Sequence, residues 1–439
     1  MNGKRLLLSV GTLCMVLMVQ AQDLTLNLQK AIDIALAENP TIRVADKEIE
    51  LKRIADTEAW QALLPEVTAN ASIQHTLLAA EMNLGGQKFK MGADNRNTAA
   101  ASATLSVPVF APAVYQSMKL TKMDIELARE KARSSRLDLI NQVTKAYYQM
   151  LLAQDSYEVM QQSYDISKEN YDVISSKFDV GRVSEYDKIT AEVQMRSMNS
   201  SLVSAQTGLT LAELQLKVLM GINTDVKVVI DDKLENYETA LKLENIDEGE
   251  SLLQNNSAIR QLDMNRSMLE RTLKMQRTNF MPNVAFSLTG QYQSLQNDNW
   301  RIWNYEWSPS ASLTIAVSIP IFRASNWTKL KSTKLQIASL EDTKANTQRQ
   351  LAMAAQNYMH NMAASMAQVN SNREAIMKAD KALSIAKTRY DVGRGTILEL
   401  NQSEVALTQA QLTYNQSIYD YLRNKAELDY TLGRETYLR

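Results

Sequence analysis

Phe178-Asp179-Val180-Gly181-Arg182 is the stretch that decides the fold, because it returns in the second half of the chain as Tyr390-Asp391-Val392-Gly393-Arg394. Two further pairs keep the same offset: Pro108-Val109-Phe110 with Pro320-Ile321-Phe322, and Gly221 with Gly433. Three collinear matches at one constant spacing indicate an internal duplication rather than chance. We therefore divide the mature chain into two structural repeats, residues 22–230 and 231–439.

The two copies differ in length near their start. Pro65 matches Pro282 at a slightly larger offset than the one that holds through the rest of the repeat. The extra residues therefore fall between Pro65 and Pro108, and the first copy has the longer loop there.

The quoted motif interrupts two long helical segments. Neither glycine nor proline occurs in residues 113–180 or 321–392, and apolar residues recur every seventh position within both. A sustained heptad predicts coiled-coil packing, and ~66 residues at 1.5 Å per residue make a rod of roughly 100 Å.

Each Val-Gly-Arg motif predicts a tight turn, since glycine readily adopts positive φ. A capping box follows in both copies, from Ser184 to Asp187 and from Thr396 to Glu399, and then a second heptad run begins. We expect two antiparallel helical hairpins, at about 112–220 with a tip at 180–183 and at about 323–432 with a tip at 392–395.

Before each helical hairpin the pattern has period two, which predicts β-hairpins at about 66–108 and 283–320. Each strand has ~10 residues, enough to cross a bilayer when tilted, and the polar positions are small and uncharged. Trp300, Trp303 and Trp307 cluster at the second hairpin loop, as an aromatic girdle would. The alternatives are an ordinary sheet with one face on a core and scattered surface aromatics.

Four strands cannot close a barrel, and an open sheet edge cannot lie in lipid. If the strands span a membrane, several chains share one barrel, with eight strands from two chains or twelve from three. The sequence alone does not choose between them, although eight strands would leave an interior mostly filled by side chains.

Composition and the N-terminus limit the other possibilities. Residues 1–21 are predicted to be a secretory signal peptide, and the single cysteine, Cys14, lies inside it. The net charge of -1 gives no indication of nucleic acid binding. No catalytic motif is present, and His75 and His360 are far apart, so we expect neither an enzyme nor a cofactor or metal site.

The paired turns with their capping boxes, the duplicated strand hairpins between prolines, and the Gly221 and Gly433 endings resemble the TolC-like outer membrane efflux protein family. The resemblance covers essentially the whole mature chain. It implies a mixed α/β membrane protein and a homotrimer, in which four transmembrane β-strands per chain form a shared twelve-stranded barrel and long coiled-coil helices form a periplasmic α-barrel. It also implies outer-membrane lipid around the strands, a periplasmic membrane-fusion (adaptor) protein, and an inner-membrane pump of RND, ABC or MFS type.

The resemblance further implies a gate and a docking surface at the tips. The gate residues carried over by position are Arg182, Asp187, Tyr390, Arg394 and Glu399. The adaptor contacts carried over are Val180, Gly181, Val392 and Gly393. We hypothesise that Asp187 and Glu399 make the closed mouth weakly cation-selective; alternatively they only complete capping boxes, and the glycines only serve the turns. Gln402 stands where some members carry a second acid, so a double acidic ring is not expected.

The expected function is an outer-membrane channel component of a tripartite efflux or secretion system, passing small molecules such as drugs or toxic compounds to the outside. The alternatives are a type I protein secretion duct and a non-conducting structural coiled-coil surface protein.

Overall fold

The computed structural model describes residues 24–77, 80–85, 87–91, 97–242, 253–297 and 300–434; the expected signal peptide, residues 1–21, lies outside them. The chain divides into two compact units. A helical unit comprises Met1–Ile42, Arg136–Gly249 and Met353–Arg439, and a sheet unit comprises Arg43–Ser135 and Glu250–Ala352. Each unit therefore takes segments from both repeats.

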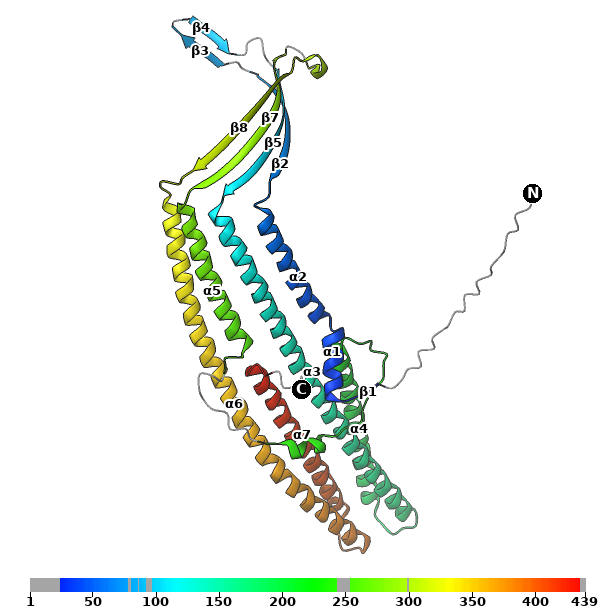
Figure 1. Ribbon diagram of the computed structural model, residues 1–439. Coiled ribbons are helices and arrows are strands. Elements are labelled where there is room, and N and C mark those ends of the chain that lie inside the picture. The colour runs from blue at the N-terminus through cyan, green and yellow to red at the C-terminus, as the bar shows by residue number, and fades with distance from the viewer. Residues whose placement is uncertain are drawn as a thin grey trace, which may run out of the picture. The chain divides into compact units, whose positions relative to one another are not determined.

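The sheet unit holds a four-stranded antiparallel sheet in the order β2-β5-β7-β8 (Figure 1). Its strands are β2 (Glu66–His75), β5 (Asn97–Phe110), β7 (Asn283–Asn297) and β8 (Ser308–Ser318). The two hairpins join through β5 and β7, so that β2 and β8 are the edge strands.

Pairing across the sheet aligns residues of like polarity. Leu288 is paired with Leu105 on one side and Leu313 on the other, and the next residue, Thr289, is paired with Thr104. Directly paired residues project from the same face of a sheet, so leucines lie on one face and threonines on the other. The hydroxyls of Thr104 and Thr289 lie 3.1 Å apart, within hydrogen-bonding distance.

The loop of the first hairpin contains a two-stranded hairpin of its own, β3 (Ala80–Leu84) and β4 (Gln87–Met91). The loop of the second contains only the short helix η4 (Ile302–Asn304) among its described residues. The extra length expected for the first copy therefore lies in the loop of the first hairpin.

Helices lie beyond one end of the sheet, opposite β3 and β4 (Figure 1). They are α2 (Pro40–Gln61), α5 (Ser257–Arg277), η3 (Thr278–Phe280), and the first parts of α3 (Pro112–Asp179) and α6 (Ala324–Asp391). Buried Glu130 of α3 accepts a hydrogen bond from Ser257 at 2.7 Å and forms an ion pair with Arg260 at 3.4 Å. These contacts fix the start of α5 against α3.

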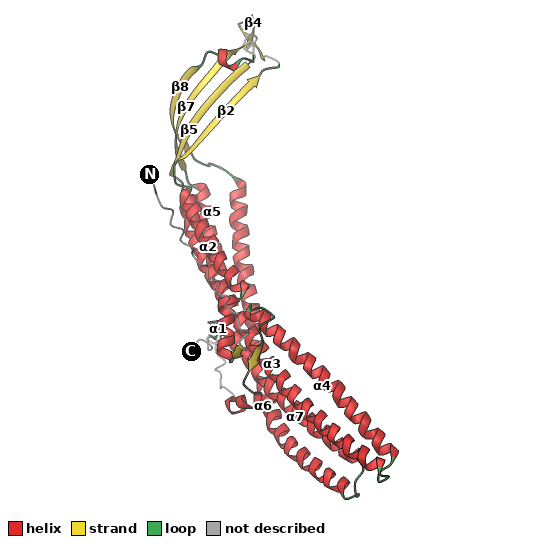
Figure 2. Cartoon of the chain, turned by 90° about the vertical axis from the view of Figure 1, so that its right-hand side faces the viewer, coloured by secondary structure: helices red, strands yellow, loops and turns green. Residues whose placement is uncertain are grey.

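The helical unit contains α1 (Leu28–Glu38), α4 (Glu185–Met220), α7 (Ile397–Thr431) and the remaining parts of α3 and α6 (Figure 2). A parallel pair, β1 (Leu24–Leu26) and β6 (Val228–Ile230), and the helix η1 (Leu234–Ala240) complete it. Val143, Leu151 and Ile418 are fully buried between the helices. Among the described helices, none combines the length and the apolar composition that a membrane-spanning helix requires.

Candidate gate at the helical tips

The two helical tips have the same turn geometry. Gly181 and Gly393 have φ angles of 72° and 70°. In each tip the glycine N–H donates to the carbonyl three residues before it, and the following arginine N–H donates to the carbonyl five residues before it, both arginine bonds being 2.8 Å long. A Cβ atom added at either glycine would meet nothing within 4 Å. The positive φ therefore accounts for glycine here, and the space around it is open.

Exposed apolar side chains stand beside these glycines. Val180 is 69% exposed and Val392 is 65% exposed, although both are residues that ordinarily prefer a core. The structure thus places all four predicted adaptor-contact residues on the surface, as one small patch on each tip.

The two predicted gate acids are held differently. The Asp187 carboxylate accepts a hydrogen bond from the Ser184 N–H, and the Asp187 N–H donates to the Ser184 hydroxyl, which completes a capping box. Glu399 donates its N–H to Thr396 at 3.2 Å, but its carboxylate lies 3.5 Å from the Arg389 guanidinium. The second capping box is therefore only half formed, and the Glu399 carboxylate forms an ion pair with Arg389 of α6 instead.

The tips also meet across the repeats. Lys177 of the first repeat lies 4.0 Å from the Asp391 carboxylate and 5.4 Å from the centre of the Tyr390 ring. Burial, with Asp187 and Asp391 nearby, raises the pKa of the Tyr390 hydroxyl. Asp187 thus lies near enough to Tyr390 for its charge to act on the hydroxyl.

The two predicted gate arginines are placed otherwise. Arg182 and Arg394 lie in the exposed turns, and within the described residues their side chains make no ion pair. The cations that form the ion pairs of the tips are Lys177, Lys188 and Arg389.

An apolar cluster stands beside these charges and joins all four helices of the tips. Its buried members are Ile174 of α3, Ala191 of α4, Ala386 of α6, and Ile397 and Leu400 of α7. Because α3 and α4 belong to the first repeat and α6 and α7 to the second, this tip cluster holds the two hairpins together.

Comparison with known proteins gives the family of this duplicated fold. The family described as outer membrane efflux protein matches residues 31–222 and 249–434. The chain belongs to the outer membrane efflux protein family. This family is located in the outer membrane, and its description is that of an efflux protein and not of an enzyme.

Relatives of this efflux protein are similar over most of its length. Outer membrane protein TolC of Vibrio cholerae is 22% identical over 337 residues, which cover 74% of this chain and 75% of that protein. Outer membrane protein TolC of Escherichia coli is 20% identical over 423 residues, which cover 93% and 82%.

Solved structures share the fold at low sequence identity. The outer membrane protein VceC of Vibrio cholerae has a TM-score of 0.71 and 16% identity, with 93% of this chain and 96% of that chain covered. The open state of the Neisseria gonorrhoeae MtrE outer membrane channel has a TM-score of 0.70 and 19% identity, with 93% and 89% covered.

The predicted girdle tryptophans of this efflux protein are all exposed near the β7–β8 loop, Trp303 most strongly at 80%. A second set of exposed apolar side chains, not predicted from the sequence, lies at the opposite end of the strands. It includes Ile321 at 96% exposure, Phe322 and Trp327. The repeated Pro-Val-Phe and Pro-Ile-Phe segments were the available indication, because an aromatic recurs near the end of each strand pair: Phe110 is the last residue of β5, and Phe322 follows β8.

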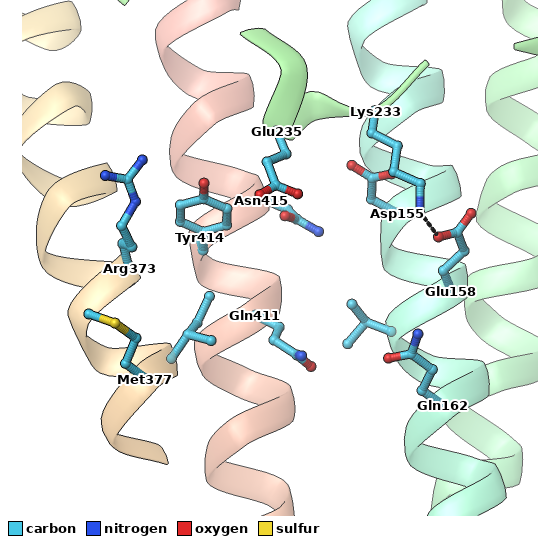
Figure 3. A pocket seen from close by; sticks show the side chains of 12 residues that line it. Asp155, Glu158, Gln162, Lys233, Glu235, Arg373, Met377, Gln411, Tyr414 and Asn415 are labelled. Carbon is cyan, nitrogen blue, oxygen red and sulfur yellow. Dashed lines mark hydrogen bonds and ion pairs between the residues drawn. The ribbon is translucent and has the colours of Figure 1, made fainter. Parts of the chain in front are cut away.

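The efflux protein also has a cavity of about 490 Å³ in the helical unit, between α3, α6, α7 and η1 (Figure 3). Asp155 of α3 accepts a hydrogen bond from the Leu234 N–H at 3.1 Å, and burial raises the Asp155 pKa to about 6. Lys233 pairs with Glu158 of α3 at 2.6 Å. On the other side, Glu238 of η1 accepts a hydrogen bond from Tyr414 of α7 at 2.8 Å. The segment around η1 is therefore fastened to helices of both repeats.

The internal repeat was the signal from which the ion-pairing cations of the tips, Lys177 and Arg389, could have been predicted. Lys177 and Arg389 are separated by the same offset as the two Val-Gly-Arg motifs and occupy the same position in the two copies. Their partners differ: Arg389 pairs with Glu399 of its own hairpin, whereas Lys177 pairs with Asp391 of the other hairpin.

Proposed function

We propose that this efflux protein is the outer-membrane channel component of a tripartite efflux system, in which three copies share one twelve-stranded barrel. The observation that carries the proposal is the sheet, which has one apolar face, one small polar face and two unpaired edges, β2 and β8. An open edge is not stable in lipid. Neighbouring copies would pair β8 with β2, and three copies leave a wider lumen than two.

The exposed apolar side chains at both ends of the strands support a membrane position. A strand of 11 residues such as β8 is roughly 36 Å long at about 3.3 Å per residue. When tilted by about 45°, it spans a membrane layer roughly 25 Å thick. This matches the apolar band of an outer-membrane barrel. Trp300, Trp303 and Trp307 would then lie at one lipid interface, and Phe322 and Trp327 at the other.

The helical tips are proposed to be the periplasmic gate, opened by movement of the two hairpins relative to each other. Arg182, Asp187, Tyr390, Arg394 and Glu399 would line the closed mouth, with Asp187 and Glu399 favouring cations. The crystal structure of the related MtrE channel shows that channel in an open state, which supports the proposal that this fold can open.

We further propose that Val180, Gly181, Val392 and Gly393 contact a periplasmic adaptor that connects the channel to an inner-membrane pump. Their exposure and the open space around both glycines support this. The cargo would be small molecules such as drugs or toxic compounds.

The test has two parts. The purified full-length chain should form trimers and conduct ions in planar lipid bilayers; a purified, lipid-reconstituted trimer without conductance would instead support a structural surface protein. In a host that depends on this channel for drug resistance, Gly393→Leu should abolish efflux while trimers still reach the outer membrane.

Gly393→Ala is the matched control for backbone strain, because both variants must hold a Cβ residue at positive φ and only leucine fills the open space. If Gly393→Ala and Gly393→Leu lost trimers or efflux equally, the glycine would serve only the turn. If drug resistance did not depend on the channel but the export of a protein did, the type I secretion alternative would replace efflux.

A further inference from the structure

A buried polar layer separates the apolar tip cluster from the rest of the interface between the two hairpins. It consists of Ser163 and Ser167 of α3 and Glu404 and Thr408 of α7. The Ser167 hydroxyl donates to Glu404 Oε1 at 2.5 Å, and the Thr408 and Ser163 hydroxyls lie 3.1 Å apart. Both contacts join the first repeat to the second.

Glu404 is the unusual member of this layer. It is only 2% exposed, and its Oε2 atom is buried with no hydrogen-bond partner among the described residues. A buried carboxylate with an unpaired oxygen is costly to keep ionised, since it has lost the water that would stabilise its charge. The packing of the two hairpins in this structure therefore favours the protonated acid.

The groups that face Glu404 do not offset this burial with charge. Desolvation by burial raises the Glu404 pKa, and the neutral side chains of Ser167 and Asn170 of α3 lower it by less, so that the net shift is upward. Ser163 contacts the Met198 sulfur of α4 at 3.3 Å, which is again an uncharged partner. Among the described residues, no charged group contributes to the shift of the Glu404 pKa.

Hydrogen-bonded layers also hold helices less tightly than apolar layers when water can enter, because water replaces their hydrogen bonds. We propose that the layer of Ser163, Ser167, Glu404 and Thr408 is the plane at which the two hairpins part when the channel opens, and that ionisation of Glu404 drives them apart. This inference rests on the proposed channel function. Glu404 acts as a positioning residue, distinct from Asp187 and Glu399 at the mouth.

The sign of the pH effect follows from the burial. In the closed state the Glu404 pKa is raised, and in the opened state water returns it toward the ordinary carboxyl value. Low pH therefore favours the closed packing, and the open state gains as pH rises through the raised pKa. Each pKa unit between the two states changes the opening equilibrium about tenfold.

The experiment measures open probability of the full-length trimer in planar bilayers over a pH series that begins near the ordinary carboxyl pKa, about 4.3, and continues past neutral pH. The wild-type open probability should rise with pH, and Glu404→Gln, which cannot ionise, should lose this rise. Ser167→Ala removes the hydrogen bond that lowers the Glu404 pKa, so the midpoint of its profile should move to higher pH. Glu374→Gln makes the same chemical change at a side chain that is 69% exposed and should follow the wild type.

The outcomes separate this inference from the function on which it rests. Absence of conductance at every pH contradicts the channel itself. Conductance with the same pH profile in wild type and Glu404→Gln overturns the role of Glu404. If Glu404→Gln fails to form trimers, the Ser167→Ala midpoint decides, and an unmoved or lowered midpoint overturns the inference.

Discussion

Removal of the Leu400 side chain should open the channel. Leu400 is 2% exposed in the tip cluster, where it packs with residues from α3, α4 and α6. Leu→Ala in a core lowers stability by about 2–5 kcal/mol. We use the lower limit of this range, because the cluster lies near the ends of its helices. If the tip cluster separates together with the adjoining polar layer when the channel opens, the loss of about 2 kcal/mol falls on the closed state, and the opening equilibrium rises roughly 30-fold.

Leu398→Ala is the matched control, because Leu398 lies two residues away on the same helix and is 51% exposed. The assay is single-channel recording of both variants in planar bilayers, together with the uptake of a large antibiotic by cells. Leu400→Ala should show long open events and drug sensitivity, and Leu398→Ala should resemble the wild type. Equal open probability in the two variants, with only thermal stability lost in Leu400→Ala, would refute a closing role for the tip cluster.

Three further predictions follow from burial and backbone geometry. Leu288→Arg on the apolar face of the sheet should destabilise the membrane-inserted barrel by about 2–4 kcal/mol and so lower the trimer yield in membrane fractions. Thr289→Arg on the polar face should give the wild-type yield. Gly221→Ala should prevent stable folding, because φ is 70° and the new Cβ would lie 2.9 Å from the Glu38 carbonyl; Gly208→Ala, in open space within α4, should raise thermal stability by up to about 1 kcal/mol. Because burial raises the Asp155 pKa from 3.8 to about 6, the wild-type melting temperature should fall as pH rises between these values, and the melting temperature of Asp155→Asn should not follow it.

Much of the architecture could be predicted from the sequence because it follows from short-range periodicity. Heptads, alternating strands and the glycine turns each depend on a few neighbouring residues, and the constant offset between the copies shows that both use them in the same order. The position of the two turns and the one-sided polarity of the sheet belong to this class, as does the apolar position of Leu288 beside polar Thr289.

The tertiary structure alone decided which of these residues are joined. In the sequence Asp187 and Glu399 are equivalent, yet one completes its capping box and the other lies beside Arg389. Leu398 and Leu400 are both leucines of one helix, and Glu404 is one of many helical acids. Their exposure and partners depend on helices that belong to the other copy and lie far away in the chain, and such contacts follow no local period. The repeat was therefore determined by the sequence, whereas the contacts that join the tips were determined by the way in which the two copies pack.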